Sequence, residues 1–156
     1  MASRKKPSEA RLKTILRRQT NPSWNSDYVP SILATVTEAP SLSRASILTP
    51  SKFDGREVHV LSPAERSFAL LGLYHPRCVG LQEQRMLSPD PCPHPLCNFP
   101  GITGIDLPPL NGLTDVADSL GYTDMLPMIQ VTEDDDPLKT MSVVFPYIGD
   151  QLWAMR

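Results

Sequence analysis

Proline is the feature that most limits how this chain can fold. It makes up 17 of the 156 residues, twice the usual share of about 5%. Each proline restricts φ and removes a backbone hydrogen-bond donor. Because the prolines are spread from Pro7 to Pro146, they keep every helix and strand short.

The apolar content predicts no large core. Aromatic residues, which bury the most area per side chain, are 6% of the chain, although a hydrophobic fraction of 40% is too high for full disorder. Such a chain cannot easily offset a backbone ordering cost of about 1–2 kcal/mol per residue. We therefore predict a mostly irregular, extended chain with a few short α-helices and minor β-structure, and no autonomous compact core.

The charges are divided between the two ends of the chain, although the formal net charge is −2. Residues 1–20 are basic apart from Glu9, and every charge between 101 and 137 is acidic. A basic head and an acidic tail can dock on different protein surfaces, or they can be two solvated ends. Because no aromatic residues interleave the basic head, we do not expect a nucleic-acid partner.

Neither a membrane span nor a secretory signal is visible in the sequence. No run approaches the ~18 apolar residues of a span, and no apolar stretch follows the basic start. Three cysteines without such a signal indicate a reduced compartment. We predict a cytoplasmic, cytoskeletal location and no membrane partner. A mitochondrial location is the alternative, because the head is Arg-rich and weakly amphipathic, although Glu9 is unusual in a presequence.

Composition divides the chain into four parts. Residues 1–20 form a basic helical head, and 21–55 form a Ser/Thr/Pro-rich linker. Residues 56–100 hold a helix and a loop rich in Pro, Cys and His. Residues 101–156 form an acidic tail with a short helix and an aromatic C-terminal anchor at 145–153.

The strongest local signal is the Ser-Pro-Ala-Glu run at 62–65. It is a capping box with proline at the first helical position. In such a box the Ser62 hydroxyl accepts from the Glu65 amide, while the Glu65 carboxylate accepts from the Ser62 amide. The pattern predicts a helix through Leu73 whose apolar side chains nearly encircle the axis, so we expect burial on several sides.

The remaining expected elements are short and separated by proline-rich connectors. Helices are predicted at 7–18, at 81–87 and at 114–120, the last closed by Gly121. Strands are predicted at 31–36, 56–61, 128–132 and 142–145.

One stretch holds all three cysteines and two of the three histidines. The pairs His75-x-x-Cys78 and Cys92-x4-Cys97 offer four nitrogen and sulfur ligands for a tetrahedral zinc ion, with His94 as an alternative ligand. Metal binding would also hold the proline-rich loop in one shape. Cysteines packed as small hydrophobic residues beside a rigid loop are the alternative. No other cofactor is expected.

Residues 64–84, AERSFALLGLYHPRCVGLQEQ, resemble the short helical entry of malic enzymes, in which a Glu-Arg pair, a Gly-Leu pair and prolines precede a glutamine. The resemblance would imply an enzyme that binds a dinucleotide and a metal ion. Arg77 breaks the proline pair, and the rest of the chain lacks the tyrosine, lysine, acidic metal ligands and dinucleotide fold of that family.

No motif in the sequence predicts a catalytic or cofactor-binding residue. The glycines are scattered rather than gathered in a phosphate-binding loop, and the acidic run lacks the spacing of a calcium loop. We predict a non-enzymatic structural or adaptor component of a large eukaryotic assembly. A microtubule lattice, as in cilia or flagella, is preferred, with tubulin or filament proteins as partners. A small zinc-binding interaction module and a compact α+β domain of unknown enzymatic activity are the alternatives.

Overall fold

The structure is a computed structural model that describes residues 7–102, 104–133 and 136–156. Within these residues, six strands associate as three antiparallel pairs, β1 with β2, β3 with β6, and β4 with β5. The elements, in chain order, are α1 Glu9–Gln19, β1 Ser46–Leu48, β2 Val58–Val60, α2 Pro63–Tyr74, β3 Cys78–Leu87, α3 Leu113–Leu120, β4 Met128–Glu133, β5 Asp136–Val144 and β6 Tyr147–Met155. Short 3₁₀ turns lie at Phe53–Gly55, Pro95–Asn98 and Thr123–Met125.

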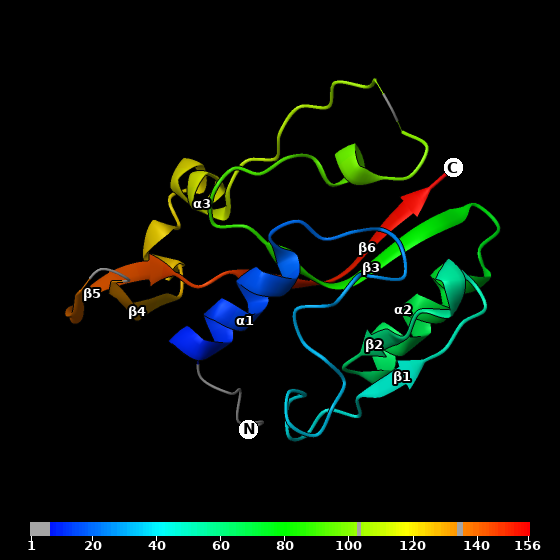
Figure 1. The fold of residues 1–156 in the computed structure, drawn as a ribbon, viewed down its shortest axis with the longest axis horizontal. Helices are drawn as coiled ribbons and strands as arrows, with labels where there is room; N and C mark the ends of the chain where they lie inside the picture. The colour runs from blue at the N-terminus through cyan, green and yellow to red at the C-terminus, as the bar shows by residue number, and fades with distance from the viewer. Residues whose placement is uncertain (1–6, 103, 134–135) are drawn as a thin grey trace.

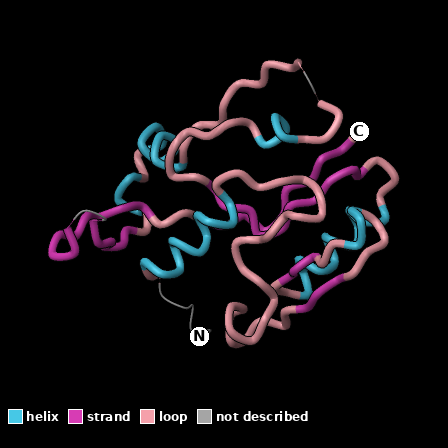
Figure 2. Tube along the Cα trace, viewed as in Figure 1, coloured by secondary structure: helices cyan, strands magenta, loops and turns pink. Residues whose placement is uncertain are grey.

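The β3–β6 ribbon runs through the middle of the molecule (Figure 1). Helix α2 and the β1–β2 pair lie toward one end, and α3 with the β4–β5 hairpin lies toward the other. Loops make up much of the trace between these elements, as the tube in Figure 2 shows. Within the described residues, no helix is long and apolar enough to cross a membrane.

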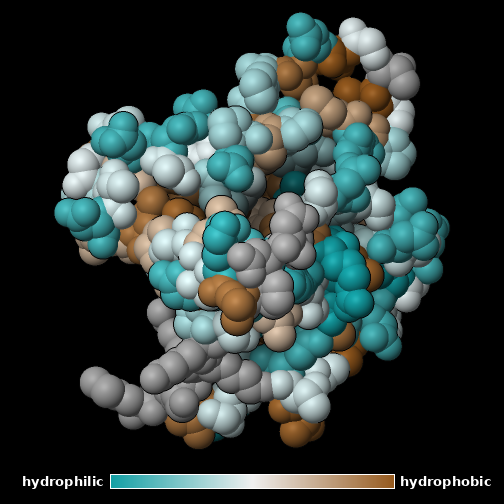
Figure 3. Space-filling view, turned by 60° about the vertical axis from the view of Figure 1, so that its left-hand side comes forward, coloured by the Kyte–Doolittle hydropathy of each residue, from teal (hydrophilic) through white to brown (hydrophobic). Residues whose placement is uncertain are grey.

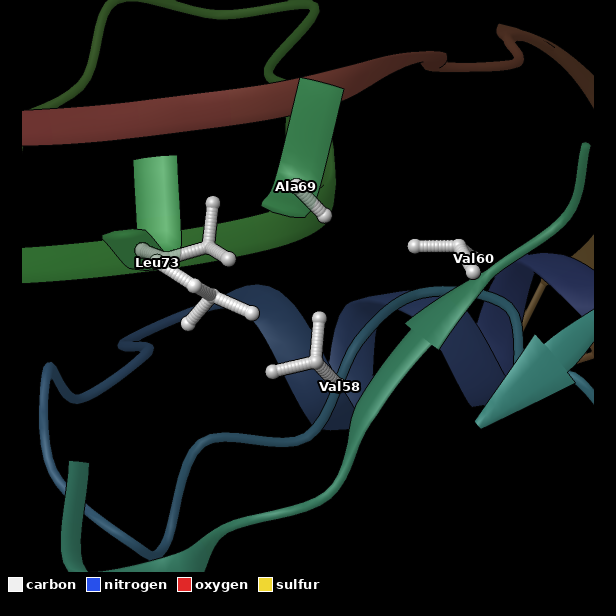
Figure 4. Close-up of a cluster of buried hydrophobic side chains, with 5 residues drawn as sticks. Val58, Val60, Ala69 and Leu73 are labelled. Atoms are coloured by element: carbon white, nitrogen blue, oxygen red, sulfur yellow. The ribbon is translucent and has the colours of Figure 1, made fainter. Parts of the chain in front are cut away.

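A cluster of buried apolar side chains joins α2 to strands β2 and β3. Val58 and Val60 are fully buried and pack with Ala69, Leu73 and Leu81. Figure 4 shows the α2 and β2 side chains pointing toward one another. The prediction of an extended chain without a compact core is therefore wrong. Apolar side chains from separate parts of the sequence pack against one another instead.

Two smaller clusters extend the core toward the N-terminal half. Leu12 and Ile15 of α1 pack with Phe145, and Ile32 of the linker packs with Ala39 and Leu61. Several small clusters thus take the place of the single large core that an aromatic-rich chain would build.

Residues 81–87 were predicted as helix, and this prediction is wrong, because they lie in β3. Their composition favours a helix in isolation. In the structure they pair with β6 from Leu81 opposite Trp153 to Leu87 opposite Tyr147. Strand pairing with a distant segment outweighs local propensity here.

Helix α2 begins as predicted, with one difference in its cap. The Ser62 hydroxyl accepts from the Glu65 N–H at 3.1 Å. The Glu65 carboxylate accepts from the Leu61 N–H at 2.9 Å, one residue before the amide expected from the capping box. It also accepts from the Gln84 amide at 2.7 Å, so the cap ties α2 to β3.

The other two predicted helices are confirmed by their caps. Helix α1 follows Ser8, whose side chain accepts from the Arg11 N–H, and α3 ends at Gly121 in the left-handed region with φ 73°. The strands predicted at 56–61, 128–132 and 142–145 are confirmed as β2, β4 and β5.

No strand forms at 31–36, contrary to prediction, because other parts of the protein satisfy its backbone donors. The Leu33 N–H donates to the Glu38 carboxylate at 3.0 Å, and the Ala34 N–H donates to His59 Nδ1 at 3.1 Å. A side chain that accepts from the backbone competes with a strand ladder.

Buried polar side chains attach α1 and the N-terminal linker to β3. The Gln19 side chain is 2% exposed and accepts from the Met86 N–H at 3.1 Å. The Tyr28 hydroxyl donates to the Glu83 carbonyl at 2.6 Å. These bonds hold the linker in place, although the regular structure between residues 21 and 55 is limited to the short strand β1 and one 3₁₀ turn.

Candidate functional site

The first predicted zinc pair lies at the turn between α2 and β3. His75 follows the last residue of α2, and its Nδ1 accepts from the Arg77 N–H at 3.2 Å. Cys78 is buried at the start of β3, and its thiol donates to the Gly80 carbonyl at 3.6 Å. Both potential ligand atoms thus have local hydrogen-bond partners.

The second pair lies on the 91–111 loop. Cys92 forms a two-way backbone bridge with Leu110, and Cys97 is exposed in a 3₁₀ turn. The Nδ1 atom of His94 accepts from the Leu96 N–H at 3.2 Å. Among the described residues, no group of three or more His, Cys, Asp or Glu side chains is placed to hold a metal ion. The zinc site stays a prediction, which metal analysis of protein purified without chelator tests.

A largely apolar groove of about 450 Å³ lies between the 91–111 loop and β6. We call it the β6 groove. Figure 3 shows hydrophobic atoms gathered on the loop where it projects from the top of the molecule. The groove is lined by 94–96, 99–102 and Leu110 on the loop side, by 152–156 on the strand side, and by Trp24 and Val79.

Trp24 holds the loop against the strand pair. It is 7% exposed, its indole N–H donates to the Pro95 carbonyl at 2.8 Å, and its ring meets the Phe99 ring edge-on at 5.3 Å between centroids. The Cys92–Leu110 bridge closes the loop at its base. These contacts hold the loop wall of the groove in position, although the loop has little regular structure.

Gly80 of β3 permits the close approach of this aromatic pair. A Cβ at this position would lie 2.7 Å from the Trp24 ring and 2.8 Å from the Phe99 ring. Real Cβ atoms do not approach other atoms so closely. One or both rings must therefore move if a side chain is added here.

We expect Gly80→Ala to lower the free energy of unfolding by about 1–3 kcal/mol, the usual effect of overpacking. The measurement is urea unfolding followed by circular dichroism. Gly149→Ala is the matched control in the paired strand, because a Cβ there would meet its nearest atom at an ordinary 3.7 Å. Equal effects of the two substitutions would contradict the contact of Gly80 with the rings.

Strand β6 has one unpaired edge. In the described part of the chain its only strand neighbour is β3, and no other backbone hydrogen bond of these residues reaches 147–155. Successive side chains of a strand point to opposite faces. A groove lined by the five consecutive residues 152–156 therefore borders this end of β6 and is not confined to one face of the strand.

The C-terminal end of the groove is basic. Arg156 lines it, and the exposed Arg77 donates through Nε to the Arg156 carbonyl. Neither guanidinium group forms a salt bridge with an acidic side chain of the described residues, and His94 lies on the opposite wall. An anionic group would be attracted to this end of the groove.

The segment predicted as an aromatic C-terminal anchor contributes to the fold as well as to the groove. Phe145 is 8% exposed within the core, and a Cβ at Gly72 of α2 would lie 3.0 Å from the Trp153 ring. Deleting this segment would remove β6 and one wall of the groove together.

Away from the β6 groove, Arg56 and Glu83 form a buried ion pair. Nη1 of Arg56 lies 2.8 and 2.9 Å from the two carboxylate oxygens of Glu83, and the two side chains are 4% and 0% exposed. The carboxylate also accepts from the His59 N–H, and Arg56 donates to the Leu81 carbonyl. The guanidinium lies 5.0 Å from the centroid of the Tyr28 ring.

This ion pair is a structural feature and not a site open to ligands. None of the five cavities described for these residues is lined by Arg56, Glu83, His59 or Tyr28. Burial raises the pKa of the Tyr28 hydroxyl, which stays protonated and donates to the Glu83 carbonyl. The group therefore joins the linker, β2 and β3.

His59 should make the stability depend on pH. Burial lowers the pKa of its imidazole in the fold, although Glu83 and Glu57 oppose the shift. The unfolded histidine, with a pKa near 6.5, therefore binds a proton before the folded one, so stability falls as pH falls below that value. Protonating Nδ1 would also break its hydrogen bond with Ala34.

Between about pH 7 and pH 5.5 we expect the free energy of unfolding to fall by about 1 kcal/mol more in the wild type than in His59→Gln. Urea unfolding of both proteins at the two pH values measures the difference. Equal pH dependence of the two proteins would contradict the assignment to His59.

Sequence reasoning missed the residues that build the groove. Trp24 was placed in a linker, and the strand side of the groove was read as an anchor rather than as a strand. The alternation of apolar and polar residues that marks a strand is weak at 147–155. No local pattern indicates that Trp24 contacts Pro95, which lies 71 residues further along the chain.

Comparisons with known proteins provide no relative. No protein-family model matches the chain, and no curated protein or solved structure is significantly similar to it. The resemblance of residues 64–84 to malic enzymes gains no support from these comparisons, and in the structure these residues form α2 and part of β3.

Proposed function

We propose that the chain is a non-enzymatic protein-binding component of a larger assembly and that it binds its partner in the β6 groove. The observation that carries this proposal is the combination of apolar walls with an unpaired strand edge on a folded chain. Apolar grooves that offer main-chain hydrogen-bonding groups are typical of peptide and protein recognition.

Further apolar surface supports a binding role. Phe68, Leu71 and Tyr74 follow one another at three-residue spacing along α2 and are 62%, 66% and 84% exposed, so the expectation that this helix is buried on several sides is wrong. Exposed apolar surface of this kind marks interaction sites more often than isolated side chains do.

The cytoskeletal part of the expected function stays a prediction. It rested on an extended chain suited to lining a microtubule wall, and the compact fold removes that physical argument. Co-sedimentation of the purified chain with polymerised tubulin tests it, because pelleting no greater than that of the chain alone would count against it. The enzymatic alternative likewise stays a prediction.

The proposal is tested by comparing two substitutions on the same loop. Leu110 lines the groove and is 42% exposed, whereas Ile105 is 61% exposed and does not line it. We expect Leu110→Asp to lose partner proteins in quantitative co-purification from cells, while Ile105→Asp keeps them. The same set of bound proteins for both variants and the wild type would overturn the groove as the binding site.

A further inference from the structure

We propose that the β6 groove binds an extended peptide segment of its partner, which pairs with β6 as a third strand. This inference rests on the proposed function and specifies the conformation and chemistry of what the groove takes. It is carried by the main-chain edge, by the apolar walls and by the charge at one end of the groove.

The edge of β6 requires a partner with unpaired backbone groups. In an antiparallel strand with one neighbour, alternate residues direct their N–H and C=O groups away from that neighbour. An exposed edge of this kind is a template for another strand. A helix cannot satisfy it, because its own backbone groups are already paired, whereas an extended segment satisfies it residue by residue.

The walls determine the side chains of the segment. Leu96, Phe99 and Ile102 line the loop side, and Leu152 lines the strand side. Because side chains alternate along a strand, every second residue of the bound segment would face these apolar walls. The five lining residues 152–156 match a segment of about five residues, which spans roughly 16 Å.

The positive charge at one end of the groove determines the charge of the bound segment at that end. Arg156 lines the groove there, and Arg77 is held beside it. Since neither is paired with an acidic side chain of the described residues, the segment would carry an aspartate or glutamate at this end. The occupant is thus a short extended segment with alternating apolar residues and one acidic end.

Selection from a phage-displayed library of random linear eight-residue peptides against the full chain provides the probe. Synthetic copies of the selected peptides are then methylated at one backbone nitrogen at a time. If the peptide pairs with β6, methylation at alternate positions should weaken binding about tenfold or more, and methylation at the positions between should change it little. On binding, alternate amides within β6 should exchange their hydrogens more slowly.

Two groups of variants complete the test. Leu110→Asp should abolish binding of the selected peptides and Ile105→Asp should not, while Arg77→Glu should weaken peptides that carry an acidic end. Peptides that bind in the groove without an alternating response to methylation would overturn strand pairing and leave the proposed function standing. Failure to select any peptide sensitive to Leu110→Asp would also overturn the inference, whereas the proposed function is judged separately by co-purification.

Discussion

Replacing Glu83 with glutamine is expected to lower the free energy of unfolding by about 3–5 kcal/mol. The glutamine keeps the shape of the side chain but leaves the Arg56 guanidinium, which is buried at 4% exposure, without its counter-charge. An uncompensated buried charge is among the most destabilising changes in a protein core. Urea unfolding of the full chain, followed by circular dichroism, measures the effect.

A surface ion pair provides the control for this prediction. Lys13 pairs with Glu9 one helical turn away on α1 and is 64% exposed, so Lys13→Met should have little effect. Arg56→Met should destabilise about as much as Glu83→Gln, and the double variant less than the sum of the two. A loss below about 1 kcal/mol for Glu83→Gln would contradict a stabilising role of the pair between β3 and the segment that precedes β2.

Gly112→Ala is expected to have the second largest effect, a loss of about 3 kcal/mol or more in the free energy of unfolding. A Cβ at Gly112 would lie 2.3 Å from the Pro89 carbonyl oxygen and 2.6 Å from the Asp90 carbonyl carbon. These are main-chain atoms, so a side-chain rotation cannot relieve the clash.

The same substitution should also move α3. The N–H groups of Leu113 and Thr114 donate to the Ser88 and Pro89 carbonyls at 2.8 and 3.1 Å, which fixes the start of the helix to this turn. Urea unfolding measures the loss, and amide hydrogen exchange should show faster exchange in α3. Asn111→Ala, a substitution at the exposed neighbouring position, is the control. Equal stability of the two variants would contradict the close approach of Gly112 to 89–90.

Local features of the sequence were enough to predict the helices and part of the strands. Ser8, Ser62 and Gly121 act at helix ends in the structure as their residue types predict. They could be read from the sequence because each acts on backbone groups within a few residues.

The sequence did not reveal which strands pair. Residues 81–87 have helix-favouring side chains and become a strand only because β6 lies beside them. The buried Gln82, Glu83 and Gln84 look like solvent-exposed residues in the sequence, yet their exposed fractions are 1%, 0% and 2%. Each of these side chains hydrogen-bonds to a distant segment, Gln82 to the Ser23 carbonyl, Glu83 to Arg56 and Gln84 to Glu65. Sequence spacing carries no information on such partners.

The candidate site could not be predicted for the same reason. The cysteines and histidines that suggested zinc have local hydrogen bonds and do not cluster among the described residues. The groove depends instead on Trp24, Gly80 and β6, which the fold brings together from three separate parts of the chain.

By itself, the sequence determined the three helices, strands β2, β4 and β5, and the proline-rich connectors, because propensity, capping and proline geometry act over a few residues. The tertiary structure alone decided that the chain has a core, that β3 is a strand, and that an unpaired edge of β6 lies beside an apolar loop. These features come from contacts between residues far apart in the chain, whose free energy depends on burial and pairing partners rather than on neighbouring residues.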